Sequence, residues 1–241
     1  MASVLIFAGG TGSRMGTTSA PKQFLDYGGK PLIIHTIEHF QSNDSISRIV
    51  VVVPDGWIDK FLVMVSRFGL TKVASVVKGG STGQESIYLG LKKLAEDCPT
   101  PDEVVLVHDG VRPLINDRII DECTQVAAET GGAVTVYPAV ETIVSSANGK
   151  NIEDIYPREK LYTAQAPQAF KLLDLLSAHE EARASGASEF VDSCSMMLEL
   201  KGIKATFVIG SRANIKVTTP EDYYMSSALL QLERMHEVEG L

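Results

Sequence analysis

The sequence predicts an α/β fold in which a central sheet is covered by helices on both faces. Two observations carry this prediction: short apolar runs recur along the chain, and stretches with helical periodicity lie between them. The 241 residues show no internal repeat, low-complexity tract or linker. We therefore expect a single domain that spans residues 1–241.

The apolar runs are short and mostly unalternated, as expected for strands that are buried on both faces. They lie at 3–8, 48–53, 72–77, 103–108, 132–138 and 204–210. The helical patterns lie at 31–41, 56–68, 81–96, 116–130, 169–186, 190–201 and 219–235. The first helical pattern begins at Pro31, a residue whose fixed φ suits the first position of a helix.

One segment, residues 140–162, breaks the alternation of strands and helices. Its residues are of extended type around Asn148-Gly149, the dipeptide that best supplies the positive φ angles of a two-residue type I′ turn. The pattern predicts a β-arm at about 139–163 that projects from the domain. A lone hairpin cannot bury both of its faces, so the arm either folds back or packs against a second subunit. A homodimer is therefore one expectation.

The overall composition disfavours several classes of protein. With 22 basic and 30 acidic side chains the net charge is −8, which disfavours non-specific binding to nucleic acid. No apolar run is long enough to cross a membrane. The chain enters its first apolar run without a basic leader region or a cleavage site. We therefore expect a soluble, cytoplasmic protein.

The stretch AGGTGSRMG, residues 8–16, directly follows the first expected strand. Its glycines are Gly9, Gly10, Gly12 and Gly16. They allow the backbone to approach a ligand closely and to point amide groups at it, which suits phosphates. The spacing is not that of a P-loop, because Lys22 is preceded by Pro21, and Pro21 also interrupts the helix that a dinucleotide fingerprint would open. A purely structural turn is the alternative.

Two cations, Arg14 and Lys22, flank this glycine-rich backbone. Such an arrangement suits the holding of a polyphosphate in which negative charge builds up during phosphoryl or nucleotidyl transfer. The alternative is that both are solvated surface charges.

Five motifs resemble the family of cytidylyltransferases that make CDP-methylerythritol or CDP-ribitol. They are AGGTGSRMG followed by PKQF, GGSTGQESIYLGL, VHDGVRP, AQAPQAF and NIKVTTPED, and together they cover nearly the whole chain. Each motif alone is modest, but five in register are specific. The resemblance implies a Rossmann-like nucleotidyltransferase sheet, CTP as a substrate, a divalent cation such as Mg²⁺, and a homodimer formed through the β-arm.

In the resembling enzymes the glycine loop and the GGSTGQES loop hold the nucleotide. The residues that the resemblance assigns to it are Phe7, Ala8, Gly9, Gly10, Gly12, Gly80, Ser81, Thr82, Gly83, Gln84, Glu85, Ser86 and Asp109. From the residues alone, Ser81 is expected to be the N-cap of the third helix, with Glu85 in its first turn.

The motif VLVHDGVRP places Asp109 at the end of a buried strand, at the edge where open α/β sheets bind ligands. A carboxylate there can help to hold Mg²⁺ beside phosphate oxygens, although capping of the next turn is an alternative role. His108 has no second histidine or cysteine at zinc-ligand spacing. We therefore expect it to be a packed histidine at the strand end.

The resemblance assigns the phosphate of the second substrate to Arg112, Thr142, Arg158 and Lys216. It implies that Arg158 reaches across the dimer and that Lys216 holds the attacking phosphate against the α-phosphorus. A solvated lysine on an extended segment is the alternative for Lys216. The catalytic residues that the resemblance implies are Arg14, Lys22, Arg158 and Lys216.

The implied reaction is an attack by a polyol phosphate oxygen on the α-phosphorus of CTP, which releases pyrophosphate without a covalent enzyme intermediate. A phosphate monoester is a competent nucleophile at neutral pH, because its second pKa is about 6. Catalysis then consists of positioning and charge neutralisation.

The acceptor is predicted from two positions. Enzymes that act on methylerythritol phosphate usually carry threonine where Ala166 and Val191 stand, and HDGVRP resembles the ribitol phosphate group. We therefore expect D-ribitol 5-phosphate, whose product CDP-ribitol would serve a bacterial wall or capsule polymer such as a teichoic acid. The alternatives are a methylerythritol 4-phosphate enzyme of isoprenoid synthesis, a sugar-1-phosphate nucleotidyltransferase and a non-catalytic, nucleotide-binding regulator.

Overall fold

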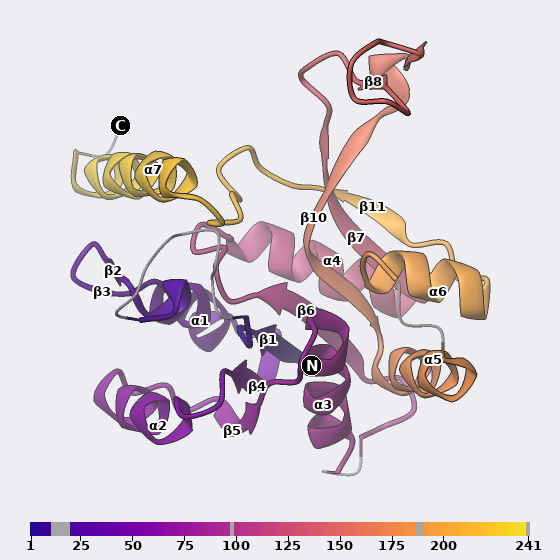
Figure 1. Cartoon of the computed structure of the whole chain (residues 1–241). Helices are drawn as coiled ribbons and strands as arrows, with labels where there is room; N and C mark the ends of the chain where they lie inside the picture. The colour runs from indigo at the N-terminus through magenta and orange to yellow at the C-terminus, as the bar shows by residue number, and fades with distance from the viewer. Residues whose placement is uncertain (11–19, 97–98, 187–189, 240–241) are drawn as a thin grey trace.

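The structure is a computed structural model that describes residues 1–10, 20–96, 99–186 and 190–239. In this part of the chain a seven-stranded sheet forms the centre of the molecule, with the strand order β11-β7-β10-β6-β1-β4-β5 (Figure 1). Its strands are β1 (Ala2–Phe7), β4 (Ile46–Val53), β5 (Val73–Lys78), β6 (Val104–Asp109), β7 (Gly132–Pro138), β10 (Tyr162–Lys171) and β11 (Thr206–Ile209). The α/β prediction is confirmed.

Helices cover both faces of this sheet. They are α1 (Leu32–Ser42), α2 (Ile58–Arg67), α3 (Gly83–Ala95), α4 (Asp117–Thr130), α5 (Leu172–Ser185) and α6 (Ser193–Lys201). The last helix, α7 (Pro220–Glu239), packs instead against a separate small cluster that includes Tyr27 and Leu32. Pro31 is the N-cap of α1 and pairs in the short strand β3 (Lys30–Pro31) with β2 (Asp26–Tyr27), so it stands one position before the helix that it was expected to open. None of the described helices is long and apolar enough to cross a membrane.

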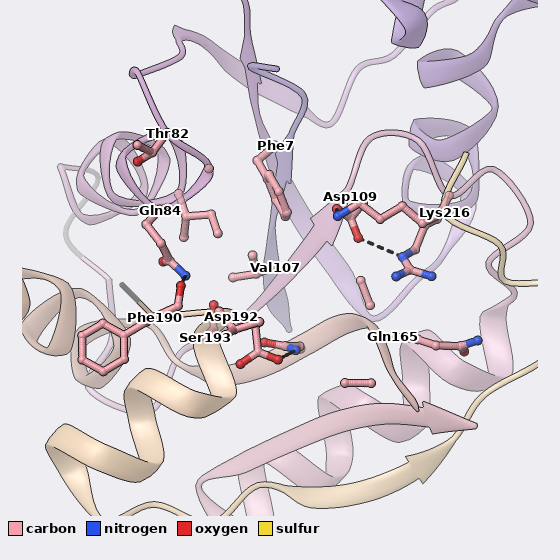
Figure 2. A pocket seen from close by; sticks show the side chains of 17 residues that line it. Phe7, Thr82, Gln84, Val107, Asp109, Gln165, Phe190, Asp192, Ser193 and Lys216 are labelled. Carbon is pink, nitrogen blue, oxygen red and sulfur yellow. Dashed lines mark hydrogen bonds and ion pairs between the residues drawn. The ribbon is translucent and has the colours of Figure 1, made fainter. Parts of the chain in front are cut away.

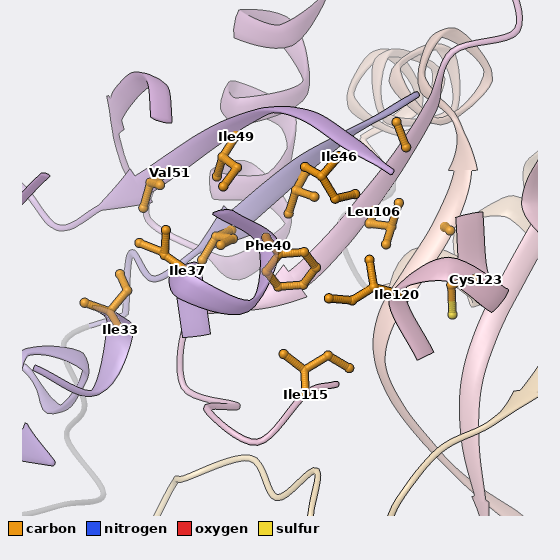
Figure 3. Packing of buried hydrophobic residues seen from close by; sticks show 14 of the residues in the cluster. Ile33, Ile37, Phe40, Ile46, Ile49, Val51, Leu106, Ile115, Ile120 and Cys123 are labelled. Carbon is orange, nitrogen blue, oxygen red and sulfur yellow. The ribbon is translucent and has the colours of Figure 1, made fainter. Parts of the chain in front are cut away.

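Alternate residues of β1 point to opposite faces, so that the strand is buried on both. Val4 and Ile6 belong to the apolar cluster formed with α1, α2 and α4, whereas Leu5 belongs to the cluster formed with α3, α5 and α6. Figure 3 shows part of the first cluster, in which Phe40 of α1 and Ile120 of α4 meet over the strands. Packing in these two clusters holds the strands in position, including the edge of the sheet at which the polar residues of the candidate site lie.

Strand β10 is the main element that the sequence pattern missed. It runs antiparallel to both β6 and β7, and its last residues, 169–171, were expected to be helical. The run YTAQAPQAFK holds one β-branched residue, Thr163, and its middle is made of alanine, glutamine and proline, so its local propensity for a strand is weak. Pairing on both sides overrides that weakness, and α5 begins only at Leu172.

The segment 140–160 forms a hairpin that projects from the rest of the molecule (Figure 1). Its short strands β8 (Val144–Ser145) and β9 (Asp154–Ile155) are antiparallel, and residues 146–153 join them. The predicted two-residue turn is therefore wrong. Gly149 has φ +66°, but Asn148 uses its Oδ1 to accept hydrogen bonds from the amides of Lys150 and Asn151, which makes a wider loop.

Candidate functional site

The site lies at the edge of the sheet where β1 and β6 end. These strands are parallel and in register, so that Phe7, the last residue of β1, pairs with Asp109, the last residue of β6. The carboxyl ends of parallel strands are where open α/β sheets bind ligands. Asp109 therefore stands at the predicted edge.

Asp109 is buried and is contacted by two cations. Lys216 Nζ lies 2.6 Å from its Oδ1, and Arg112 Nε lies 2.8 Å from its Oδ2. The side chain of Asp109 is 7% exposed, whereas that of Lys216 is 41% exposed. The carboxylate is therefore enclosed by protein, while the lysine also faces solvent.

Backbone contacts hold the two cations in place. Arg112 Nη1 donates to the carbonyl of Asn214 at 2.7 Å, and the amide of Val217 donates to the carbonyl of Val111 at 2.9 Å. The segment that carries Lys216 is thus joined to the segment that carries Arg112. Sequence positions about 100 residues apart meet at one carboxylate.

The environment of Asp109 acts on its pKa in two opposed ways. Burial favours the neutral acid and raises the pKa, but the charges and hydrogen bonds of Arg112 and Lys216 favour the carboxylate. The cations prevail and lower the pKa to about 2. Asp109 is therefore a carboxylate at neutral pH.

A pocket at this edge, here called the glycine pocket, has a volume of about 510 Å³. It is lined by Phe7, Ala8, Gly9, Gly10, Lys22, Gln23, Gly80, Ser81, Thr82, Gly83, Ser86, Asp109, Val111 and Lys216. Most of the residues assigned to the nucleotide by resemblance therefore lie around one cavity. Lys22 enters it from a short 3₁₀ turn, Lys22–Phe24.

The glycine loop is held by a neighbouring side chain and by close backbone contact. The buried Gln23 donates through Nε2 to the carbonyls of Ala8 and Gly10. Gly9 and Gly79 approach so closely that a Cβ added to Gly79 would lie 3.0 Å from Gly9 Cα. Glycine at these two positions lets the loops after β1 and β5 meet at the pocket.

The N-terminus of α3 forms another wall of the glycine pocket. The N-cap is Thr82, whose Oγ1 accepts from the amide of Glu85, so the expectation that Ser81 is the cap is wrong. Ser81 instead donates from its amide and its hydroxyl to Glu85 Oε2, each at 2.7 Å. The sequence STGQE places two hydroxyl residues before the helix, and only the geometry separates the capping residue from its neighbour.

The second pocket, here called the acceptor-side pocket, has a volume of about 530 Å³ (Figure 2). It is lined by Phe7, Thr82, Gly83, Gln84, Ile87, Val107, Asp109, Arg112, Ala164, Gln165, Ala166, Gln168, Phe190, Val191, Asp192, Ser193 and Lys216. Ala166 and Val191, the two predicted acceptor positions, both lie in this lining. The residues common to both pockets are Phe7, Thr82, Gly83, Asp109 and Lys216.

Several predicted residues are not brought to this site within one chain. Thr142 and Arg158 are exposed on the projecting hairpin, where Arg158 Nη1 donates to the carbonyl of Val140 at 3.0 Å. Neither residue lines either of the two pockets. Arg14 and Gly12 lie outside the described residues.

His108 is packed in the core, as predicted. Its ring meets Phe40 edge-on at 5.0 Å between centroids, and burial lowers its pKa to about 3. Among the described residues no group of three or more histidine, cysteine or carboxylate side chains could hold a metal ion.

Sequence reasoning missed several residues of the acceptor-side pocket. Gln165, Gln168, Asp192 and Ser193 lie in the lining, and Asn214 stands behind it. The motif AQAPQAF contained the two glutamines, and the neighbouring stretch FVDSCS contained the aspartate and the serine. They carried no signal of their own, because their shared position depends on β10 and on the start of α6.

Comparison with known proteins gives a consistent result. The family model of 2-C-methyl-D-erythritol 4-phosphate cytidylyltransferase matches residues 2–232. The chain is 45% identical over 237 residues to a ribitol-5-phosphate cytidylyltransferase of Streptococcus agalactiae serotype V, with 98% of each chain covered. It is 43% identical over 236 residues to a protein of the same name from Vibrio parahaemolyticus, again with 98% of each covered.

Solved structures of similar fold are also named for the methylerythritol phosphate reaction. The chain is similar to 2-C-methyl-D-erythritol 4-phosphate cytidylyltransferase from Thermus thermophilus, with 28% identity, a TM-score of 0.75, and coverage of 95% of this chain and 98% of that one. 4-diphosphocytidyl-2C-methyl-D-erythritol synthase from Anaerococcus prevotii has a TM-score of 0.81 at 24% identity, with 96% of each chain covered. At that identity the likeness shows the fold alone.

Proposed function

The chain belongs to the 2-C-methyl-D-erythritol 4-phosphate cytidylyltransferase family and is a nucleotidyltransferase, and we propose that it transfers CMP from CTP to D-ribitol 5-phosphate. The products are CDP-ribitol and pyrophosphate. Full-length relatives with 43–45% identity carry the name of this reaction, whereas the relatives of known structure named above are named for the methylerythritol reaction.

The observation that carries the proposal is that the two pockets meet at Asp109 and Lys216. A transferase must bring a donor and an acceptor to one point, and here the shared wall holds a cation beside a carboxylate. The glycine pocket, with its glycine backbone and Lys22, suits the polyphosphate of CTP. The acceptor-side pocket, with Arg112 and Lys216, suits a phosphate with an uncharged tail.

In the proposed reaction the acceptor phosphate attacks the α-phosphorus of CTP. Lys216 orients the attacking oxygen, while Lys22 and Arg14 neutralise the charge that develops on the donor phosphates. Phe7, Ala8, Gly9, Gly10, Gly12 and residues 80–86 would hold the nucleotide. Because the phosphate monoester is already ionised at neutral pH, these residues act by position and charge rather than by proton transfer.

A divalent cation fits this site as a partner of the substrate's phosphates. Asp109 is the carboxylate of the shared wall, and Mg²⁺ usually takes one or two carboxylates together with phosphate oxygens and water. Each oxygen of Asp109 accepts one hydrogen bond from a cation, which leaves a lone pair for a further contact. When bound, such an ion would neutralise charge on the CTP phosphates.

The projecting hairpin supports a homodimer in which one protomer completes the other's site. Its exposed apolar side chains include Ile143, Val144, Ile152 and Ile155, which a partner would cover. Thr142 and Arg158 do not line the two pockets of their own chain, and in such a dimer the family resemblance implies that they reach the acceptor phosphate of the partner. We further propose that the protein is a single cytoplasmic domain whose product serves a wall polymer such as a teichoic acid.

The test is pyrophosphate release from CTP and Mg²⁺, with ribitol 5-phosphate and methylerythritol 4-phosphate offered in parallel. Turnover with ribitol 5-phosphate alone is the expected result. Turnover with methylerythritol 4-phosphate alone would overturn the proposal that ribitol 5-phosphate is the acceptor. Silence with both, followed by turnover with a hexose 1-phosphate, would indicate a sugar-1-phosphate nucleotidyltransferase, and CTP binding without any turnover would indicate a regulator.

A further inference from the structure

The acceptor-side pocket has two chemically different ends. Figure 2 shows Asp109 and Lys216 on one side, and Asp192, Ser193 and Phe190 on another, with Val107 between them. The first end carries the cations Arg112 and Lys216. The second end carries hydroxyl, amide and carboxylate groups and, among the described residues that line it, no cation.

Asp192 is fixed in orientation at the second end. It is the N-cap of α6, and its Oδ1 accepts from the amide of Ser195 at 2.8 Å. Its Oδ2 accepts from Gln168 Nε2 at 2.8 Å, and Gln168 Oε1 in turn accepts from the amide of Cys194 at 3.1 Å. Each carboxylate oxygen accepts about two hydrogen bonds, so Asp192 retains acceptor capacity toward the pocket.

Ser193 supplies a second polar group beside it. The residue is 2% exposed and lines the pocket, yet no hydrogen bond joins its hydroxyl to any residue that the structure describes. This hydroxyl is not one of the fully buried polar atoms that lack a partner in the described part of the chain, so a ligand or a water in the pocket can pair with it. Asp192 and Ser193 therefore present an acceptor and a hydroxyl side by side.

This arrangement matches an anion with a polyhydroxylated tail. The phosphate of such a molecule suits the cations at the first end, and its hydroxyl groups, as hydrogen-bond donors, suit a carboxylate at the second end. We propose that Asp192 and Ser193 recognise the hydroxyl groups of the acceptor's polyol chain and favour a long polyol phosphate over a short one. The inference rests on the proposed function, because it names how the same site selects its acceptor.

Ala166 and Val191, where methylerythritol phosphate enzymes are expected to carry threonine, have no hydroxyl group. Other polar groups of the pocket can still recognise a polyol chain. Ala166 is buried in the pocket wall, and Val191 is 94% exposed at its mouth. Neither side chain offers a hydrogen bond, so that the polar contacts available near them are those of Asp192, Ser193 and the glutamines. The polar groups that can recognise such a tail therefore lie at the start of α6 and on β10.

The test compares ribitol 5-phosphate with glycerol 3-phosphate, a shorter polyol phosphate with the same kind of head group. Glycerol 3-phosphate is measured as an acceptor and as a competitive inhibitor, so that a lack of turnover still yields an affinity. The variants are Asp192→Asn and Ser193→Ala. In Asp192→Asn the side-chain amide has one acceptor oxygen, whereas the carboxylate of Asp192 uses both of its oxygens to accept from Ser195 and Gln168. Asparagine is still a good N-cap for α6.

The preference for the long acceptor is expected to fall about tenfold in Asp192→Asn and about fivefold in Ser193→Ala, the size of single hydrogen bonds to a charged and to a neutral group. The KM for CTP is expected to stay unchanged. Asp59→Asn and Ser66→Ala are matched controls, because both residues are exposed on α2 and line neither pocket. Melting temperatures establish that the variants fold.

The proposal would be overturned if a variant used or bound both acceptors less well by the same factor, or if neither variant changed the preference for the long acceptor. Either result would leave the proposed function intact. Inactivity of the unaltered enzyme with every polyol phosphate would overturn both this inference and the proposed function. A loss confined to the long acceptor supports the proposal.

Discussion

Lys216 and Asp109 form an ion pair of 2.6 Å in which the carboxylate is buried and the lysine is half exposed. The lysine is thus aligned by a fixed partner while it lines both pockets. Arg112 keeps Asp109 charged from the other side, at 2.8 Å. An anion that enters either pocket therefore meets a cation whose position is already set.

Replacing Lys216 by methionine is expected to lower kcat/KM by roughly 10²–10³, the effect of removing one preorganised charged donor. Methionine keeps much of the side-chain volume, so the loss reflects charge rather than packing. Steady-state kinetics with CTP and the acceptor measure it. Lys204→Met is the control, because Lys204 is exposed and lines neither pocket. A loss below tenfold would contradict the assigned role of Lys216.

Asn214 is expected to act as a positioning residue. It is fully buried, its carbonyl accepts from Arg112, and its Nδ2 donates to the carbonyl of Ala166 at 2.7 Å. Asn214→Ala removes the donor to the carbonyl of Ala166 and so loosens the link between Arg112 and the pocket wall. The KM for the acceptor is expected to rise about tenfold while the KM for CTP changes little, at a stability cost of about 1–3 kcal/mol.

The matched variant is Asn151→Ala on the exposed hairpin loop. Equal rises in both KM values of Asn214→Ala would indicate a general loss of structure instead. Chemical denaturation of both variants separates the two effects.

The sequence predicted the sheet because its strands bury both faces, and that requirement appears as continuous apolar runs. RIVVVV and EVVLVH are continuous apolar runs of the kind typical of strands in the middle of a covered sheet, and both form buried strands. Asp109 could be placed for the same reason, because the residue that ends a buried parallel strand must lie at a known edge. These predictions depend on local pattern alone.

What the sequence could not predict depends on contacts between distant segments. Strand β10 has weak local propensity and exists because β6 and β7 pair with it. The pairing of Lys216 with Asp109 requires α7 to dock so that the preceding segment meets Val111, which no spacing reveals. The eight-residue loop of the hairpin replaced the expected tight turn because Asn148 bonds forward to two amides.

Gly90 is expected to be required for the packing of α3 on the sheet. A Cβ at this position would lie 2.1 Å from Leu5 Cδ1 and 3.0 Å from Val52 Cγ2, both in the buried core. Gly90→Ala is therefore expected to destabilise the fold by about 1–3 kcal/mol, although alanine favours a helix by up to about 1 kcal/mol. Urea denaturation measures this change. Gly83→Ala is the contrast, because space is open around Gly83, and an equal loss there would contradict the packing argument.

Acid is expected to destabilise the protein through its buried histidines, beginning below pH 6.5. Burial is the main cause that lowers the pKa of His35 to about 4, of His108 to about 3 and of His179 to about 4. In the unfolded chain these rings take up protons near pH 6.5, whereas in the folded chain they stay neutral until the pH nears the lowered values. The unfolded state thus binds more protons in this window, and stability falls as the pH falls.

Each histidine contributes up to about 1.4 kcal/mol per pH unit between pH 6.5 and its folded pKa. Denaturation by urea at pH 7, 6 and 5 gives the slope directly. His179→Gln tests the assignment, because Nε2 of His179 has no hydrogen-bond partner among the described residues and glutamine does not titrate. In this variant the free energy of unfolding is expected to depend less steeply on pH, by the contribution of one histidine. A slope identical to that of the unaltered protein would mean that His179 takes up its proton equally in both states.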